Sequence, residues 1–163
     1  MYKKTIKIVL LLAAGLAVVV GWGDDPPPAA PPAGPAVSLA KLLAEADVEA
    51  GRRAARKCVS CHGFSVSGAN RVGPNLYGIV GAAKGGKSGF VYSDAMGRAG
   101  GTWTHEDLDA FLENPAAVVP GTRMTFPGLP DRRERAAIIA FLRSVTDNPP
   151  PLPVDSHPLG HEE

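Results

Sequence analysis

Two cysteines and a histidine stand together in the segment RKCVSCHGF, residues 56–64. Cys58 and Cys61 are the only 2 cysteines of the 163-residue chain, and His62 follows Cys61 directly. Thiol and imidazole groups at this spacing can form a disulfide, carry out dithiol redox chemistry, bind a metal ion or attach a larger group covalently.

The setting of the cysteines argues against the first three chemistries. A disulfide across two intervening residues closes too small a loop to stabilise the fold much. A thioredoxin-like dithiol needs a strand-rich βαβ unit, and the sequence has no credible strand pattern. A zinc site needs a fourth ligand, and no second pair of Cys or His stands at the spacing of a zinc finger. A structural metal or dithiol module remains the alternative interpretation.

Covalent haem attachment accounts for all three residues at once. The thiols of Cys58 and Cys61 add to the two vinyl groups of a haem, and the adjacent His62 then lies under the iron as its proximal ligand. One such motif predicts one covalently attached haem c.

The second axial ligand separates electron transfer from catalysis, because an open iron can bind O₂ or peroxide. Methionine closes that position and raises the potential of the iron. Met1 is out of reach, Met96 follows YSDA, and Met124 lies in VVPGTRMTFPG, a segment rich in Pro and Gly. Such a loop can hold a side chain against a flat ring, so Met124 is the predicted sixth ligand. The alternative role of a methionine here is to fill a gap in the core.

Four helices are expected around these residues. Ser38 and Asp47 can cap two helices, the second of which leads into the cysteines. Two further helices fit residues 104–114 and 131–145, each of which begins with a cap residue and an acidic residue three positions later. With no strand pattern, the predicted fold class is all-α.

A long loop rich in glycine separates the second and third expected helices. It covers roughly forty residues, and a loop of that length in a compact domain needs something other than backbone pairing to organise it. A large apolar cofactor meets this need. We therefore expect small helices and long loops packed around one haem.

Four segments differ in composition: residues 1–23, 24–37, 38–147 and 148–163. The first has three lysines before an apolar run and is interpreted as a membrane anchor or a signal segment. The second is a Pro/Ala-rich linker, expected to be extended. The third is the folded domain, and the fourth is expected to be a disordered Pro-rich tail.

The charge pattern gives no sign of a nucleic-acid partner or of acid–base catalysis. The formal net charge is +1, and a strongly basic chain would be expected to bind nucleic acid. Asp107 and Asp109 are interpreted as the solvated start of a helix rather than as a catalytic pair. The predicted protein is not an enzyme.

A series of motifs in fixed order resembles the class I c-type cytochromes, the mitochondrial and α-proteobacterial cytochrome c2-like group. The similarity covers nearly all of residues 45–145. The motifs are CVSCH, VGPNLYGIVG, GFVYSDAM, GGTWTHEDLDAFLENP, VPGTRMTF and RERAAIIAFL. With its apolar start and spacer, the chain most resembles the membrane-anchored bacterial forms. The resemblance implies the cytochrome c fold and one-electron transport.

The resemblance also implies roles for residues that hold the haem. His62 and Met124 are the expected axial ligands, and the carbonyl of Pro74 is expected to accept a hydrogen bond from His62. Tyr92 and Trp103 are expected to donate to a haem propionate, because an unpaired buried carboxylate is costly.

Three further residues are assigned to the methionine loop by the same resemblance. Asn114 and Thr122 are expected to hold the loop, and Phe126 is expected to shield the haem edge. Three features depart from the family pattern. One is the absence of the lysines that flank the methionine loop in the mitochondrial proteins, and the other two are single positions. Ala82 stands where an arginine near the propionates is common, and Phe111 stands where a tyrosine commonly donates to the methionine sulfur.

A place in a respiratory chain follows from the resemblance. The cytochrome bc1 complex is the expected electron donor, and a terminal haem-copper oxidase, cytochrome c oxidase, is the expected acceptor. The expected location is the bacterial inner membrane, with a single-pass N-terminal anchor in the lipid bilayer and the haem domain in the periplasm. The alternatives are a periplasmic carrier released by signal cleavage and a small haem peroxidase with an open iron.

Overall fold

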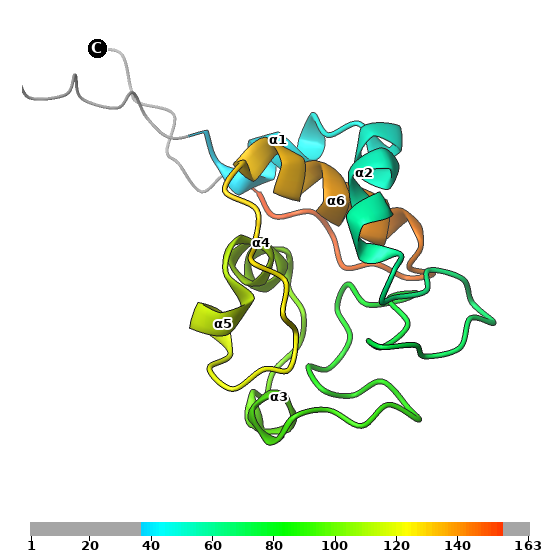
Figure 1. Ribbon diagram of the computed structural model, residues 1–163. Helices are drawn as coiled ribbons and strands as arrows, with labels where there is room; N and C mark the ends of the chain where they lie inside the picture. Colours follow the sequence, from blue (N-terminus) through cyan, green and yellow to red (C-terminus); the bar gives the residue numbers. More distant parts are fainter. Residues whose placement is uncertain (1–36, 155–163) are drawn as a thin grey trace, which may run out of the picture. The chain divides into compact units, whose positions relative to one another are not determined.

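The computed structural model describes residues 37–154, and residues 1–36 and 155–163 lie outside the description. Helices are the regular elements of the described part, in which no strand occurs and one isolated bridge joins Ala83 to Thr102 (Figure 1). This confirms the predicted all-α class. In chain order the elements are α1 (Leu39–Ala44), α2 (Val48–Ala54), η1 (Ala55–Cys58), α3 (Asp94–Arg98), α4 (His105–Glu113), α5 (Pro115–Val118) and α6 (Arg132–Ser144).

The predicted cap residues begin four of these helices. The side chain of Ser38 caps α1, and that of Asp47 caps α2. Thr104 forms a capping box with Asp107 at the start of α4, and Asp131 caps α6. Each cap satisfies a backbone N–H group that has no partner inside its helix. The sequence therefore placed these four starts correctly.

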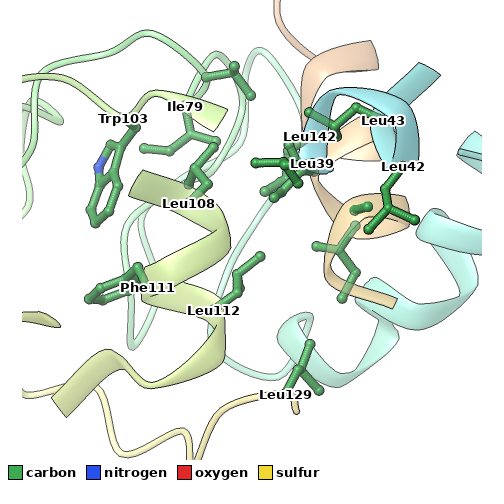
Figure 2. Packing of buried hydrophobic residues seen from close by; sticks show 14 of the residues in the cluster. Leu39, Leu42, Leu43, Ile79, Trp103, Leu108, Phe111, Leu112, Leu129 and Leu142 are labelled. Atoms are coloured by element: carbon green, nitrogen blue, oxygen red, sulfur yellow. The ribbon is translucent and has the colours of Figure 1, made fainter. Parts of the chain in front are cut away.

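Helix α6 is the centre of the packing and contacts α1, α2 and α4. Its side chains Ile138 and Ile139 are almost fully buried. Gly51 lets α2 approach closely, because a Cβ atom there would lie 1.9 Å from the backbone oxygen of Ala137 on α6. Figure 2 shows the apolar cluster, with side chains of α1, α4 and α6 packed together with Leu129 and Ile79.

Long-range backbone hydrogen bonds organise the glycine-rich segment between η1 and α4. Gly81 donates to the carbonyl of Trp103, and Trp103 donates to the carbonyl of Ala82, both at 2.8 Å. Gly78 donates to the carbonyl of Val145 at 3.0 Å, which ties the segment to the end of α6. The loop is thus fixed by distant parts of the chain.

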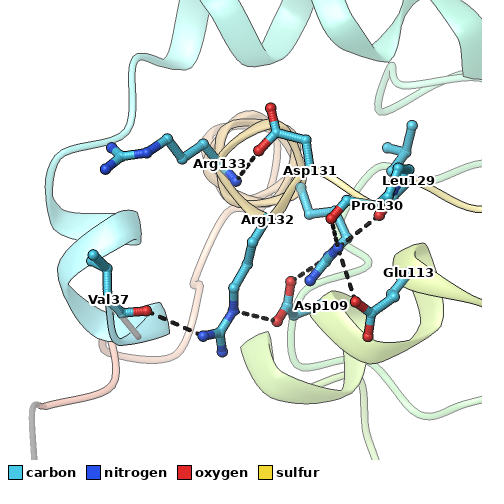
Figure 3. Close-up of polar contacts among 9 residues, drawn as sticks. Val37, Asp109, Glu113, Leu129, Pro130, Asp131, Arg132 and Arg133 are labelled. Atoms are coloured by element: carbon cyan, nitrogen blue, oxygen red, sulfur yellow. Dashed lines mark hydrogen bonds and ion pairs between the residues drawn. The ribbon is translucent and has the colours of Figure 1, made fainter. Parts of the chain in front are cut away.

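A buried ion pair joins α4 to α6 (Figure 3). The side chain of Arg135 is only 3% exposed, and its Nε donates to Asp109 at 2.6 Å. Its Nη1 donates to the carbonyls of Leu129 and Pro130, just before α6. Arg132 also donates to Asp109, at 3.1 Å. Asp109 is therefore a buried structural carboxylate, and its interpretation as part of a solvated helix start is wrong.

Residues after α6 return along the domain. The hydroxyl of Tyr77 donates to Asp147, and Arg143 donates to the carbonyl of Pro150. The side chain of Pro150 also lies against Gly81. The described part of the expected tail, residues 148–154, contains no helix or strand, and its Pro150 makes the last two of these contacts.

The predicted membrane anchor needs correction. Residues 1–23, on which it was based, lie outside the described residues. Between residues 37 and 154 no helix is long and apolar enough to cross a membrane. The longest is α6 with 13 residues, about 20 Å of helix against a bilayer core of about 30 Å. The structure does not support a single-pass N-terminal anchor. The expected inner-membrane location and bilayer contact, which depended on this anchor, are not supported either.

The variant Arg135→Met tests the importance of the buried ion pair. It leaves Asp109 buried without its closest cation, so we expect a loss of about 3 kcal/mol in the free energy of unfolding. Guanidinium unfolding of the holoprotein measures this loss. The matched control is Arg132→Met, whose side chain is 42% exposed and should cost less than about 1 kcal/mol. Equal costs for the two variants would contradict this interpretation.

His105 predicts a dependence of stability on pH. Its side chain is buried and its Nε2 has no partner among the described residues. Burial lowers the pKa of His105 below 6.5; the nearby Arg143 lowers it further, and Glu106 opposes the shift. The unfolded chain therefore takes up a proton first, and the folded state loses relative stability as the pH falls below about 6.5. Replacing His105 with Gln should flatten the decline in unfolding midpoint between pH 7.5 and pH 5, and an unchanged slope would refute the idea.

Candidate functional site

One cavity of about 660 Å³ brings the predicted haem residues together. Its walls include Cys58, Cys61, His62 and Met124, which come from segments far apart in the sequence. Most of the remaining wall is apolar, from side chains such as Leu108 and Ile138. A cavity of this size and character is typical of a cofactor site.

Two close contacts fix the ring of His62. Its Nδ1 lies 2.7 Å from the carbonyl oxygen of Pro74. A carbonyl can only accept, so Nδ1 carries the hydrogen and Nε2 keeps its lone pair. Gly73 packs against the ring, where a Cβ atom would lie 2.3 Å from Cε1 of His62. Burial lowers the pKa of His62, although the hydrogen bond to Pro74 opposes the shift. The imidazole is thus neutral at pH 7 and able to bind a metal through Nε2.

Both cysteines are free thiols, half-buried at the cavity. Cys58 is the last residue of η1, and its carbonyl accepts from the backbone N–H groups of Cys61 and His62. This turn presents both sulfurs and the imidazole to one cavity. Burial raises the pKa of the Cys58 thiol, while the neighbouring Lys57 acts in the opposite direction. In residues 37–154 no group of three or more His, Cys, Asp or Glu side chains is arranged to hold a metal ion.

The structure separates the two candidate methionines. Met124 lines the cavity, whereas Met96 on α3 is buried in the apolar core and does not line it. The backbone N–H of Met124 donates to the hydroxyl of Thr122 at 3.3 Å, which steadies the turn before the methionine. Met96 therefore fills space in the core, whereas the Met124 side chain lies at the cavity that His62 also lines.

The other predicted residues fall into two groups. All but one of them line the same cavity: Pro74, Tyr92, Trp103, Thr122 and Phe126. Asn114 does not; its side chain caps α5 by accepting from the N–H of Ala117 at 3.1 Å. Asn114 thus acts on the start of the segment that leads to Met124.

Aromatic pairs form part of the cavity wall. The ring of Trp103 lies 4.9 Å from that of Phe111, and the ring of Tyr92 lies 4.8 Å from that of Phe90. Within residues 37–154 neither the Tyr92 hydroxyl nor the indole N–H of Trp103 donates to a protein group. Two polar donors are therefore available to a ligand in the cavity.

Sequence reasoning missed much of the apolar wall. Leu108 and Leu112 of α4 and Leu142 of α6 line the cavity. Phe111 lines it too, and the resemblance had already placed this residue near the methionine sulfur. Their spacing of three to four residues is the signal of one helix face. That signal distinguishes a buried face from an exposed one, but it does not say whether a helix or a cofactor covers it.

Comparison with known proteins settles the family. A family model described as Cytochrome c matches residues 48–146. The chain belongs to the cytochrome c family. This cytochrome is 53% identical over 119 residues to a cytochrome c homolog of Bradyrhizobium diazoefficiens, a match covering 72% of this chain and 65% of that relative. The chain therefore spans slightly less than two thirds of that relative's length.

Two further matches agree with this assignment. This cytochrome is 44% identical over 88 residues to cytochrome c2 of Rhodopila globiformis, covering 54% of this chain and 82% of that protein. The solved structure of cytochrome cH from Methylobacterium extorquens is similar with a TM-score of 0.57 and 43% identity, covering 60% of this chain and 98% of that one. The predicted class I c-type cytochrome and its fold are confirmed.

The residues of this cytochrome fit the haem c of its family. The family's haem is attached covalently, and Cys58 and Cys61 are free thiols in the C-x-x-C-H motif at an apolar cavity. The glycine at position 73 leaves room for the His62 ring that a side chain would fill. This cytochrome therefore carries covalent haem c, as the sequence predicted.

The variant Gly73→Ala tests how tightly the His62 ring is held. Its Cβ would meet three ring atoms of His62 within 2.8 Å, so the ring must shift. We expect a loss of about 1–3 kcal/mol in the free energy of unfolding and a larger high-spin fraction in the visible spectrum. Gly63→Ala is the control, because its Cβ would find its nearest atom at 3.5 Å. Equal spectra for the two variants would argue against the tight fit.

Proposed function

We propose that this cytochrome carries single electrons between redox proteins and transforms no substrate. When bound, the haem supplies a one-electron couple between ferric and ferrous iron. Cys58 and Cys61 would hold it covalently, and His62 and Met124 would bind its iron. Two protein ligands leave no position for O₂ or peroxide, and this distinguishes a carrier from a peroxidase.

The contacts around His62 support its role as the proximal ligand. The hydrogen bond from Nδ1 to Pro74, at 2.7 Å, fixes the tautomer and aims Nε2 away from the backbone. Gly73 closes the space on the other side of the ring. The imidazole is held in one orientation before it binds, which lowers the cost of rearrangement when the charge on the iron changes.

Polar groups of the wall have separate tasks in this proposal. Tyr92 and Trp103 donate to haem propionates, which would otherwise be buried carboxylates without partners. Thr122 and Asn114 shape the segment that presents Met124. Phe126 shields the edge of the haem from water.

The mouth of the cavity is mildly basic, which supports a protein partner with an acidic rim. Lys57 and Arg123 line the cavity, and Lys57 is paired with Glu134 at 2.5 Å. Val72 and Val91 also line it and are exposed. We propose the cytochrome bc1 complex as electron donor and a haem-copper oxidase as acceptor, on the resemblance to the cytochrome c2-like group.

The observation that carries the proposal is the position of Met124 in the same cavity as His62. Replacing Met124 with Leu removes the thioether and keeps the volume. We expect the ferrous wild-type protein to bind CO poorly and the Met124→Leu variant to bind it rapidly, because the sixth position is then open. Stopped-flow absorption after CO mixing measures the rate.

Met96→Leu is the matched control. This methionine lies in the core and does not line the cavity, so its replacement should cost less than about 1.5 kcal/mol of stability and leave CO binding slow. Rapid CO binding by the wild type would refute electron transfer as the function and favour a peroxidase-like iron.

A further inference from the structure

Trp103 separates two cavities of the domain. It lines the larger cavity together with the haem-attachment motif, and it also lines a second cavity of about 340 Å³. Lys84 and Arg98 line only the second cavity. The Trp103 side chain is therefore a wall that the two cavities share.

Lys84 lies against this ring in a fixed position. Its Nζ is 5.4 Å from the centre of the Trp103 ring and 2.7 Å from Oδ1 of Asp107. Its side chain is only 14% exposed. The backbone N–H of Lys84 donates to Gly101 at 3.0 Å, and that of Trp103 donates to Ala82 at 2.8 Å. Two strand-like backbone contacts thus hold the cation beside the indole.

Asp107 completes the arrangement. Thr104 donates to it from both its backbone and its hydroxyl. Burial pushes the pKa of the Asp107 carboxyl upward, but the hydrogen bonds from Lys84 and Thr104 outweigh it and lower the pKa. The Asp107 carboxyl is consequently ionised at pH 7 and pairs with the Lys84 ammonium group at 2.7 Å. Because Lys84 is largely buried, water and salt screen its field less than that of an exposed charge.

Charged side chains that line the larger cavity itself are few. In the described part of the chain they are Lys57 and Arg123, and Lys57 is paired with Glu134. The 81–84 segment, which runs beside Trp103, has Ala82 and Ala83 before Lys84. Lys84 is therefore the one cation of this segment. The other cation at the second cavity, Arg98, has a side chain that is 76% exposed, so solvent screens its charge.

We propose that the Lys84–Asp107 pair acts through Trp103 as a positioning and tuning element that sets the reduction potential of the cytochrome. This inference rests on the proposed one-electron function. Reduction adds one electron and lowers the charge of the haem site by one, with no bond made or broken. The Lys84 cation favours that change and polarises the indole so that its N–H is a stronger donor, whereas the Asp107 carboxylate opposes the change.

The test compares reduction potentials of holoprotein variants by spectroelectrochemistry. Lys84→Met should lower the equilibrium constant for reduction about threefold, or about 28 mV at 59 mV per tenfold change. Asp107→Asn should raise it by a similar factor. Lys84→Arg keeps the charge and should restore the wild-type potential, and the Lys84→Met/Asp107→Asn double variant should lie between the two single variants.

Arg98→Met is the matched control. It also removes a cation from the second cavity, but solvent already screens the charge of this exposed side chain. Its potential should stay within the error of the wild type. A purely structural role would move the potentials of Lys84→Met and Asp107→Asn in the same direction, and this result would overturn the inference. The inference would also be overturned if Lys84→Met and Asp107→Asn shifted the reduction potential no more than Arg98→Met does.

The measured couple distinguishes failure of the proposed function from failure of the Lys84–Asp107 inference. A wild-type protein without a reversible one-electron couple would overturn the proposed function and this inference together. A reversible couple that responds to neither Lys84→Met nor Asp107→Asn would overturn the inference alone. If Lys84→Met fails to fold, Asp107→Asn and Lys84→Arg still give the sign and the charge dependence.

Discussion

The large apolar cavity is the constraint on which the remaining structure depends. A pocket of about 660 Å³ with mainly apolar walls needs a group that fills it, because protein interiors are packed as densely as organic crystals. The helices α4 and α6 turn buried side chains such as Leu108 and Ile138 toward it instead of packing them fully on each other. Covalent haem supplies the missing contacts, and the long glycine-rich segment folds over the same space.

Within that space, a few short polar contacts give the apolar site its chemistry. Pro74 fixes the tautomer of His62 through a single carbonyl, and Thr122 steadies the turn before Met124. Behind the indole of Trp103 lie one charge of each sign, the largely buried Lys84 and the partly exposed Asp107. The proposed iron ligands thus lie in the cavity, and the charges proposed to tune the reduction potential lie outside its wall.

The sequence was sufficient wherever a local rule decides the structure. The helix starts at Ser38 and Thr104 follow from capping. The loop that carries Met124 led to the prediction of this methionine as ligand, and Met124 rather than Met96 lines the cavity. The short helices α3 and α5 were not predicted, because five- and four-residue helices depend on tertiary contacts rather than on propensity.

Partners far apart in the sequence explain the other failures. Asp109 looked like a surface charge, since Arg132 and Arg135 lie 23 and 26 positions away. The Lys84–Asp107 contact is hidden for the same reason, because it spans 23 positions. The predicted membrane anchor rested on the lysines and apolar run of residues 1–23 and on the resemblance to membrane-anchored forms, and the described residues 37–154 have no helix able to span a bilayer.

Axial ligation by His62 and Met124 is the central claim, and proton NMR of the ferrous holoprotein tests it most directly. A methionine bound to iron lies over the porphyrin, so ring current moves its methyl signal far upfield of the usual range. With methyl-labelled methionine, the account predicts one such signal, which persists in Met96→Leu and disappears in Met124→Leu. The absence of a shifted methyl signal in the wild type, or its persistence in Met124→Leu, would contradict the account.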